Sequence, residues 1–119
     1  MLVTKEFTFD SAHFLPNYKG KCEKMHGHTY RLQVTVEGKP DKNGLVIDFV
    51  LLKKIVNDTV LNKLDHQVIN NTVKVASTEN IAIWIWKQLN NSSEFPKKVK
   101  LHQIKLWETA NSSVTYYGK

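Results

Sequence analysis

A pair of histidines one residue apart, His26 and His28, is the feature that most constrains how this chain can fold. The residues that follow alternate strictly between polar and apolar, and the apolar ones share the parity of the two histidines: Tyr30, Leu32, Val34 and Val36. A period of two indicates a strand with one buried face and one wetter face. Both imidazoles are therefore expected to point together toward the buried face.

An earlier segment has the same period and also ends in a histidine, His13. If residues Val3–Phe14 pair in antiparallel fashion with His26–Glu37, His13 lies beside the other two histidines at one end of the sheet. Three neutral imidazoles with an open fourth position are typical of catalytic zinc, because water or a substrate oxygen can take the vacancy. The alternative is that these are hydrogen-bonded core histidines, although burying unpaired imidazoles is costly.

The length of 119 residues predicts one domain, residues 1–119, which is short for a self-contained enzyme with a deep cleft. Oligomerisation could complete a site. The N-terminus has no apolar signal core, and the longest apolar run, Ile81–Trp86, is too short to span a bilayer. The single cysteine, Cys22, fits a reducing compartment. We therefore expect a soluble, cytoplasmic protein.

The net charge of +6 favours an anionic partner. The lysines and the single arginine are scattered rather than clustered with aromatic residues, so the charge does not identify that partner. A small phosphorylated substrate, a nucleic acid and a merely solvated basic surface remain alternatives at this point.

The order of elements is predicted to be strand, strand, helix, helix, strand, strand, which indicates an α+β fold. Asp48 is expected to cap the first helix, and Ser77 to cap the second. The second helix is apolar nearly all round and needs cover on more than one side. The last two strands are predicted at Val99–Thr109 and Val114–Tyr117.

Further side chains have the chemistry of an active site. Cys22 lies in a polar, lysine-rich loop that favours a reactive thiolate, although it could be an idle loop cysteine. Asp65 and His66 lie in the link between the helices and are either an acid–base pair or a capping Asp beside a surface His. Glu108 ends an apolar strand, where a ligand with two N–H donors would offset the cost of burying it. An ordinary exposed Glu is the alternative.

In their order along the chain, these motifs resemble the 6-pyruvoyl-tetrahydropterin synthase family. The matching runs are Ser-Ala-His13, Cys22-x-x-x-His26-Gly-His28, Leu64-Asp65-His66, Ser77-Thr78-Glu79 and Trp107-Glu108-Thr109, which span nearly the whole chain. The resemblance implies a tunnelling fold: an antiparallel four-stranded sheet with two helices on one face. It also implies that three subunits close a barrel and that two such trimers stack into a homo-hexamer, which would cover the apolar helix.

The resemblance also implies a role for each matching residue. His13, His26 and His28 match the ligands of Zn²⁺, and Cys22 matches the catalytic base. Asp65 and His66 match its acid–base partners. Glu108 matches the carboxylate that anchors the pterin. Ser77 and Thr78 match positions near the pterin ring, with one departure: the proline often found before them is replaced by Ala76.

Three residues separate Cys22 from His26, and this short spacing is similar to that of the 6-carboxy-tetrahydropterin synthases of queuosine biosynthesis. The implied activity is a zinc-dependent lyase that converts 7,8-dihydroneopterin triphosphate to 6-carboxy-5,6,7,8-tetrahydropterin, acetaldehyde and triphosphate. The implied partner is thus a phosphorylated pterin, with no nucleic acid and no membrane. Two rival classes are a sister enzyme, either a 6-pyruvoyl-tetrahydropterin synthase or a side-chain aldolase, and a non-enzymatic zinc-binding module. In such a module only Cys22 could supply a fourth ligand.

Overall fold

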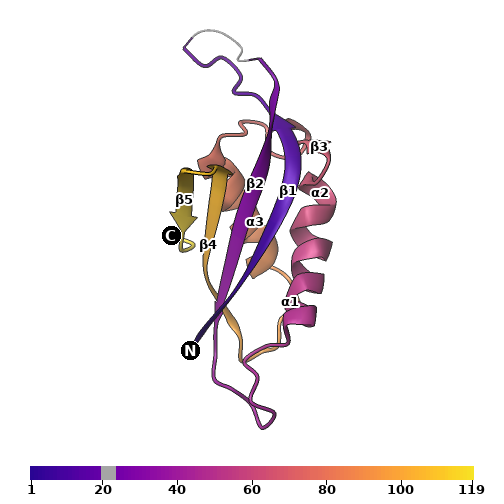
Figure 1. The fold of residues 1–119 in the computed structure, drawn as a ribbon, viewed down its shortest axis with the longest axis vertical. Coiled ribbons are helices and arrows are strands. Elements are labelled where there is room, and N and C mark those ends of the chain that lie inside the picture. The colour runs from indigo at the N-terminus through magenta and orange to yellow at the C-terminus, as the bar shows by residue number, and fades with distance from the viewer. Residues whose placement is uncertain (20–23) are drawn as a thin grey trace.

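Five strands form one sheet in the order β3-β1-β2-β4-β5 (Figure 1). The computed structural model describes residues 1–19 and 24–119. The four long strands are β1 (Leu2–His13), β2 (His26–Glu37), β4 (Lys100–Thr109) and β5 (Ser112–Tyr116), and each pairs with its neighbour in antiparallel fashion, as predicted. The prediction of four strands is wrong by one, because β3 (Gln67–Val68) pairs with β1 in parallel. Two residues are too few to show a period in the sequence.

Both predicted helix caps are present. The Asp48 side chain accepts a hydrogen bond from the N–H of Val50 at the start of α1 (Phe49–Val56), and Ser77 Oγ accepts from the N–H of Asn80 at the start of α3 (Thr78–Asn90). The first helix is longer than α1 alone. A π-helical stretch, η1 (Asn57–Leu61), and a short α2 (Asn62–Leu64) continue it without a break, and a 3-10 turn, η2 (Ile69–Asn71), follows β3.

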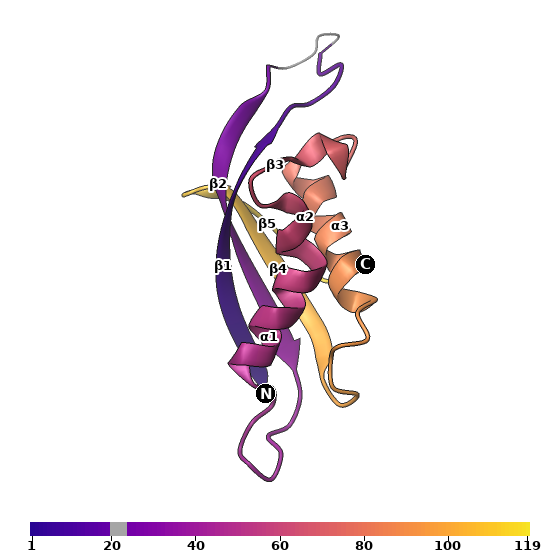
Figure 2. The same cartoon turned by 90° about the vertical axis from the view of Figure 1, so that its right-hand side faces the viewer.

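The core lies between the sheet and these helices, which cover only one of its faces (Figure 2). Every second residue of the strands points toward the helices. The largest fully buried side chains include those of Phe9, Tyr30, Leu32, Leu52, Ile55, Ile81, Ile85, Leu89, Ile104 and Leu106. Side chains of the same chain cover part of the apolar surface of α3. The Trp86 ring meets Tyr116 edge-on at 5.8 Å, and Lys63 Nζ lies 5.9 Å from the Trp84 ring.

The other face of the sheet is free of helices and is mainly polar. It carries the side chains of alternate strand residues, among them Asp10, Thr29 and Arg31, and the Arg31 guanidinium lies 3.8 Å from the centre of the Trp107 ring. The β1–β2 hairpin extends past the helices at one end of the molecule (Figure 2). Across residues 1–19 and 24–119, no helix is long and apolar enough to cross a membrane.

Candidate metal centre and adjoining pocket

Three imidazoles meet where the β1–β2 hairpin leaves the cover of the helices. The register pairs His13 with His26 and Ser11 with His28, so the three histidines lie on one face of the two strands, as predicted. Their ring centres are 4.7 to 5.0 Å apart, and one ring nitrogen of each lies within 4.8 Å of the others. His13 is buried and His28 half-buried, whereas His26 is exposed, because it stands at the projecting end of the sheet.

Backbone carbonyls fix the orientation of two of these rings. His13 Nδ1 lies 2.7 Å from the carbonyl oxygen of Ala76, and His26 Nδ1 lies 3.0 Å from that of Lys24. A carbonyl can only accept, so each Nδ1 carries the hydrogen and each Nε2 keeps its lone pair for a metal. His13 Nε2 is buried and has no hydrogen-bond partner within the described residues. This donor set fits a zinc ion with an open coordination position.

Glu108 faces this cluster from the neighbouring strand. Its Oε2 is 3.6 Å from His13 Nε2, and its Oε1 is 3.9 Å from His28 Nε2. Thr78 donates a hydrogen bond from Oγ1 to Oε2 of Glu108 at 2.8 Å, which ties the carboxylate to the first turn of α3. A helix N-terminus favours a negative charge. Ser77, Thr78 and Glu108 line one pocket of about 410 Å³ together with His13 and His26.

A tyrosine forms the floor of the cluster. Tyr30 is fully buried, and its ring meets the rings of His13 and His28 edge-on at 5.9 and 5.7 Å. Burial, and after it the charge of Glu108, raises the pKa of the Tyr30 hydroxyl far above its usual range. Tyr30 therefore stays neutral beside the histidines.

The side chains of Asp65 and His66 contact each other. His66 Nδ1 lies 3.0 Å from Oδ1 of Asp65, and the N–H of Asp10 also donates to that oxygen at 3.0 Å. The hydrogen bond from Asp10, together with the one from His66, lowers the pKa of Asp65, so this carboxyl is ionised at neutral pH. The His66 side chain is 77% exposed, which leaves Nε2 open to solvent.

The predicted site residues thus fall into two groups within one chain. His13, His26, Ser77, Thr78 and Glu108 line one pocket, whereas His28 and His66 line a separate groove. Cys22 lies outside the described residues. Sequence reasoning missed the Ala76 carbonyl and Asp10, since their contacts join segments 63 and 55 residues apart and no local pattern marks them.

Comparison with known proteins gives a consistent result. The family model described as 6-pyruvoyl tetrahydropterin synthase matches residues 2–119. A 6-carboxy-5,6,7,8-tetrahydropterin synthase of Synechocystis is 35% identical over 98% of this chain and 93% of its own. A dihydroneopterin monophosphate aldolase of Pyrococcus furiosus is 43% identical over 85% of this chain and 83% of its own.

A solved structure agrees with these sequence relatives. The 6-pyruvoyl tetrahydropterin synthase of Caenorhabditis elegans superposes with a TM-score of 0.85 at 27% identity, covering 100% of this chain and 96% of its own. The three relatives carry three different activity names.

Proposed function

Because the chain belongs to the 6-pyruvoyl tetrahydropterin synthase family of lyases, we propose that it is a zinc-dependent 6-carboxy-5,6,7,8-tetrahydropterin synthase of queuosine biosynthesis. Its substrate would be 7,8-dihydroneopterin triphosphate, and its products the carboxylated tetrahydropterin, acetaldehyde and triphosphate. The short spacing from Cys22 to His26 and the similarity to the Synechocystis enzyme favour this branch of the family.

The position of Glu108 is the observation that carries the proposal. A carboxylate can accept two N–H groups at once, and the amino and ring N–H groups of a pterin offer such a pair. With Oε2 held by Thr78 and both oxygens within 4 Å of histidine Nε2 atoms, Glu108 would place the ring so that its side chain reaches the imidazoles. Orientation of this kind can supply a large part of a rate enhancement.

His13, His26 and His28 would hold the zinc. When bound, zinc would polarise the oxygens of the substrate side chain and so acidify the adjoining C–H bonds. Cys22 would remove a proton as a thiolate, and His66 would relay protons from its open Nε2 while Asp65 fixes the ring. In the single chain His66 shares a groove with His28, whereas Glu108 lines another pocket with His13 and His26. Assembly of several chains would complete the site around both groups.

The second candidate function is side-chain aldol cleavage, which the 43% identity to the Pyrococcus furiosus aldolase favours. It would use the same pocket, with Glu108 on the ring and the histidines on the metal. The two reactions differ in the aldehyde released, so one product analysis separates them.

Incubation of the zinc-loaded protein with dihydroneopterin triphosphate should release acetaldehyde and triphosphate in equal amounts. Derivatisation of the aldehyde followed by mass spectrometry measures the outcome. Glycolaldehyde would instead indicate the aldolase, and a pyruvoyl product without aldehyde would indicate a 6-pyruvoyl synthase.

Substitution of the ring anchor tests the orientation argument in the same assay. Glu108→Gln should keep its zinc and lose at least about a hundredfold in turnover, because a misplaced reacting group costs on that order. Glu37→Gln, at the opposite end of β2, is the matched control and should turn over normally. Normal turnover in Glu108→Gln would refute the proposed pterin orientation.

A further inference from the structure

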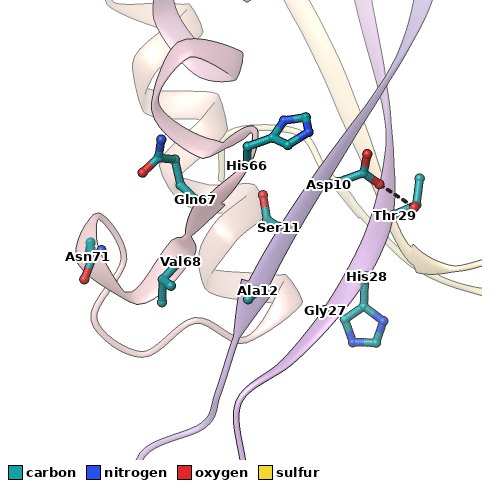
Figure 3. A pocket seen from close by; sticks show the side chains of 10 residues that line it. All are labelled: Asp10, Ser11, Ala12, Gly27, His28, Thr29, His66, Gln67, Val68 and Asn71. Carbon is teal, nitrogen blue, oxygen red and sulfur yellow. Dashed lines mark hydrogen bonds between the residues drawn. The ribbon is translucent and has the colours of Figure 1, made fainter.

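A second cluster of titratable side chains lies on the sheet face that the helices leave open. One ligand-type atom each of Asp10, Asp65 and His66 lies within 4.8 Å of the others. Asp10 belongs to β1 and alternates with Ser11, which faces the core. Asp65 and His66 come from the link between α2 and β3, so two distant segments meet here (Figure 3).

The backbone of Asp10 makes one hydrogen bond to each residue of the Asp65–His66 pair. Its N–H donates to Oδ1 of Asp65 at 3.0 Å, and its carbonyl accepts the N–H of His66 at 2.6 Å. His66 has a φ of 57°, in the left-handed region that non-glycine residues seldom adopt. These two bonds to β1 secure that conformation and direct the ring along the open face.

The side chain of Asp10 is not needed for this anchoring, yet it is held in place. Thr29 on the paired strand donates a hydrogen bond from Oγ1 to Oδ1 of Asp10 at 2.5 Å (Figure 3). The carboxylate thereby stays beside the imidazole instead of turning into solvent. It lines a groove of about 660 Å³ with Thr29 and His66, and the small residues Ala12 and Gly27 line it too.

His66 therefore faces two carboxylates. Asp65 meets its Nδ1, and Asp10 adds a second negative charge from β1. Among residues 1–19 and 24–119, the only other titratable side chain lining the groove is that of His28. The remaining polar side chains of its lining, those of Ser11, Thr29, Gln67 and Asn71, are neutral. Negative charge within about 5 Å of an imidazole favours its protonated form even in a solvated setting.

We propose that Asp10 is a positioning residue for the acid–base pair: held by Thr29, its carboxylate stabilises the His66 ring in the form that has accepted a proton. The proposal rests on the acid–base role of His66 in the proposed function, and Asp10 acts through His66 without touching the substrate. Asp65 fixes the ring and its tautomer, while Asp10 adds a second negative charge near the imidazolium.

Labelling of His66 with diethyl pyrocarbonate tests this proposal without any substrate. The reagent reacts with an imidazole in its neutral form and not in its protonated form. Trypsin releases residues 64–74 as a peptide in which His66 is the only histidine, so mass spectrometry reports its labelling rate alone. At pH 6, Asp10→Asn should label about two to three times faster than the wild type, as expected for loss of one charge at this distance in a near-aqueous setting. At pH 8.5 the rates of the two proteins should be equal.

Thr29→Val should give a smaller increase at pH 6, since it frees the carboxylate without removing it. Glu6→Gln is the matched control and should leave the rate unchanged, because it removes a carboxylate from the same face of β1, where it binds Gln33. Equal rates for Asp10→Asn and wild type at pH 6 would overturn the proposal. A rise at both pH values would also overturn it, by indicating that Asp10 only limits access to the ring. Failure of the proposed function would appear separately, as absence of the carboxylated product in the wild type.

Discussion

Backbone hydrogen bonds orient the rings of two of the three clustered histidines, without any metal ion. The Ala76 and Lys24 carbonyls each engage an Nδ1, so the Nε2 atoms of His13 and His26 are the ones that point into the cluster. Outer contacts of this kind fix the tautomer and raise the basicity of a ligand. Because the ligands are preoriented, little ordering is left for the metal to impose.

Removal of one imidazole tests the metal assignment. His26→Ala should lower zinc content from about one ion per chain to a small fraction, since two imidazoles hold the ion far less tightly. His102→Ala is the matched control, because His102 lies on β4 beside Tyr117 and does not belong to the histidine cluster. Elemental analysis after dialysis measures both. Full zinc retention in His26→Ala would contradict the assignment.

Single residues differ in how far the sequence could predict them. The shared face of His13, His26 and His28 follows from a period of two, which any reader of the sequence can count. The contact between Asp65 and His66 could not be distinguished from a mere adjacency, because it depends on the left-handed backbone of His66. The place of Glu108 beside the imidazoles followed from family resemblance, since its local sequence fits an exposed strand end equally well.

At the scale of elements, β1 is the strand on which both candidate centres depend. Its core-side residues end in His13 at the metal cluster, and on the other side Asp10 anchors the Asp65–His66 pair. The helix α3 contributes through its first turn, where Thr78 meets Glu108. Local capping and pairing signals predicted both of these elements. The π-helical η1 and the two-residue β3 could not be predicted, because neither is long enough to leave a periodic signal.

The cap of the first helix can be tested by substitution. Asp48→Ala should lower the free energy of unfolding by about 1 kcal/mol, because the N–H of Val50 loses its acceptor at the helix start. Asp48→Asn keeps an acceptor oxygen and should change the stability by much less. Chemical denaturation of both variants measures the difference. An equal loss in the two would show that charge, and not the capping bond, stabilises this end.

At the scale of the whole molecule, the single chain leaves much of its sheet uncovered. Helices protect one face only, and the other face carries polar residues around the stacked pair Arg31 and Trp107. The outer strand β5 pairs along one side alone. Exposed strand edges favour association with further chains, and closure into a ring removes them.

We expect a closed oligomer in solution, with a hexamer as the assembly implied by the family resemblance. Light scattering should give a mass of about six times the 13.7 kDa of one chain, and at least three times. A stable monomer at micromolar concentration would contradict the barrel arrangement. It would also count against the proposed acid–base role of the Asp65–His66 pair.

The alternation of side chains along β1 and β2 places the histidine cluster on one face of the sheet and the Asp10 cluster on the other. Inserting or deleting a single residue within either strand would exchange its faces, moving one of the clustered histidines to the open side and Asp10 or Thr29 toward the core. Changes in length within the two strands are therefore costly, whereas the alternation along β1 and β2 places no such constraint on the connection between His13 and His26. Divergence of the family by insertion should be concentrated in that connection, next to the position of Cys22, while the two strands keep their lengths.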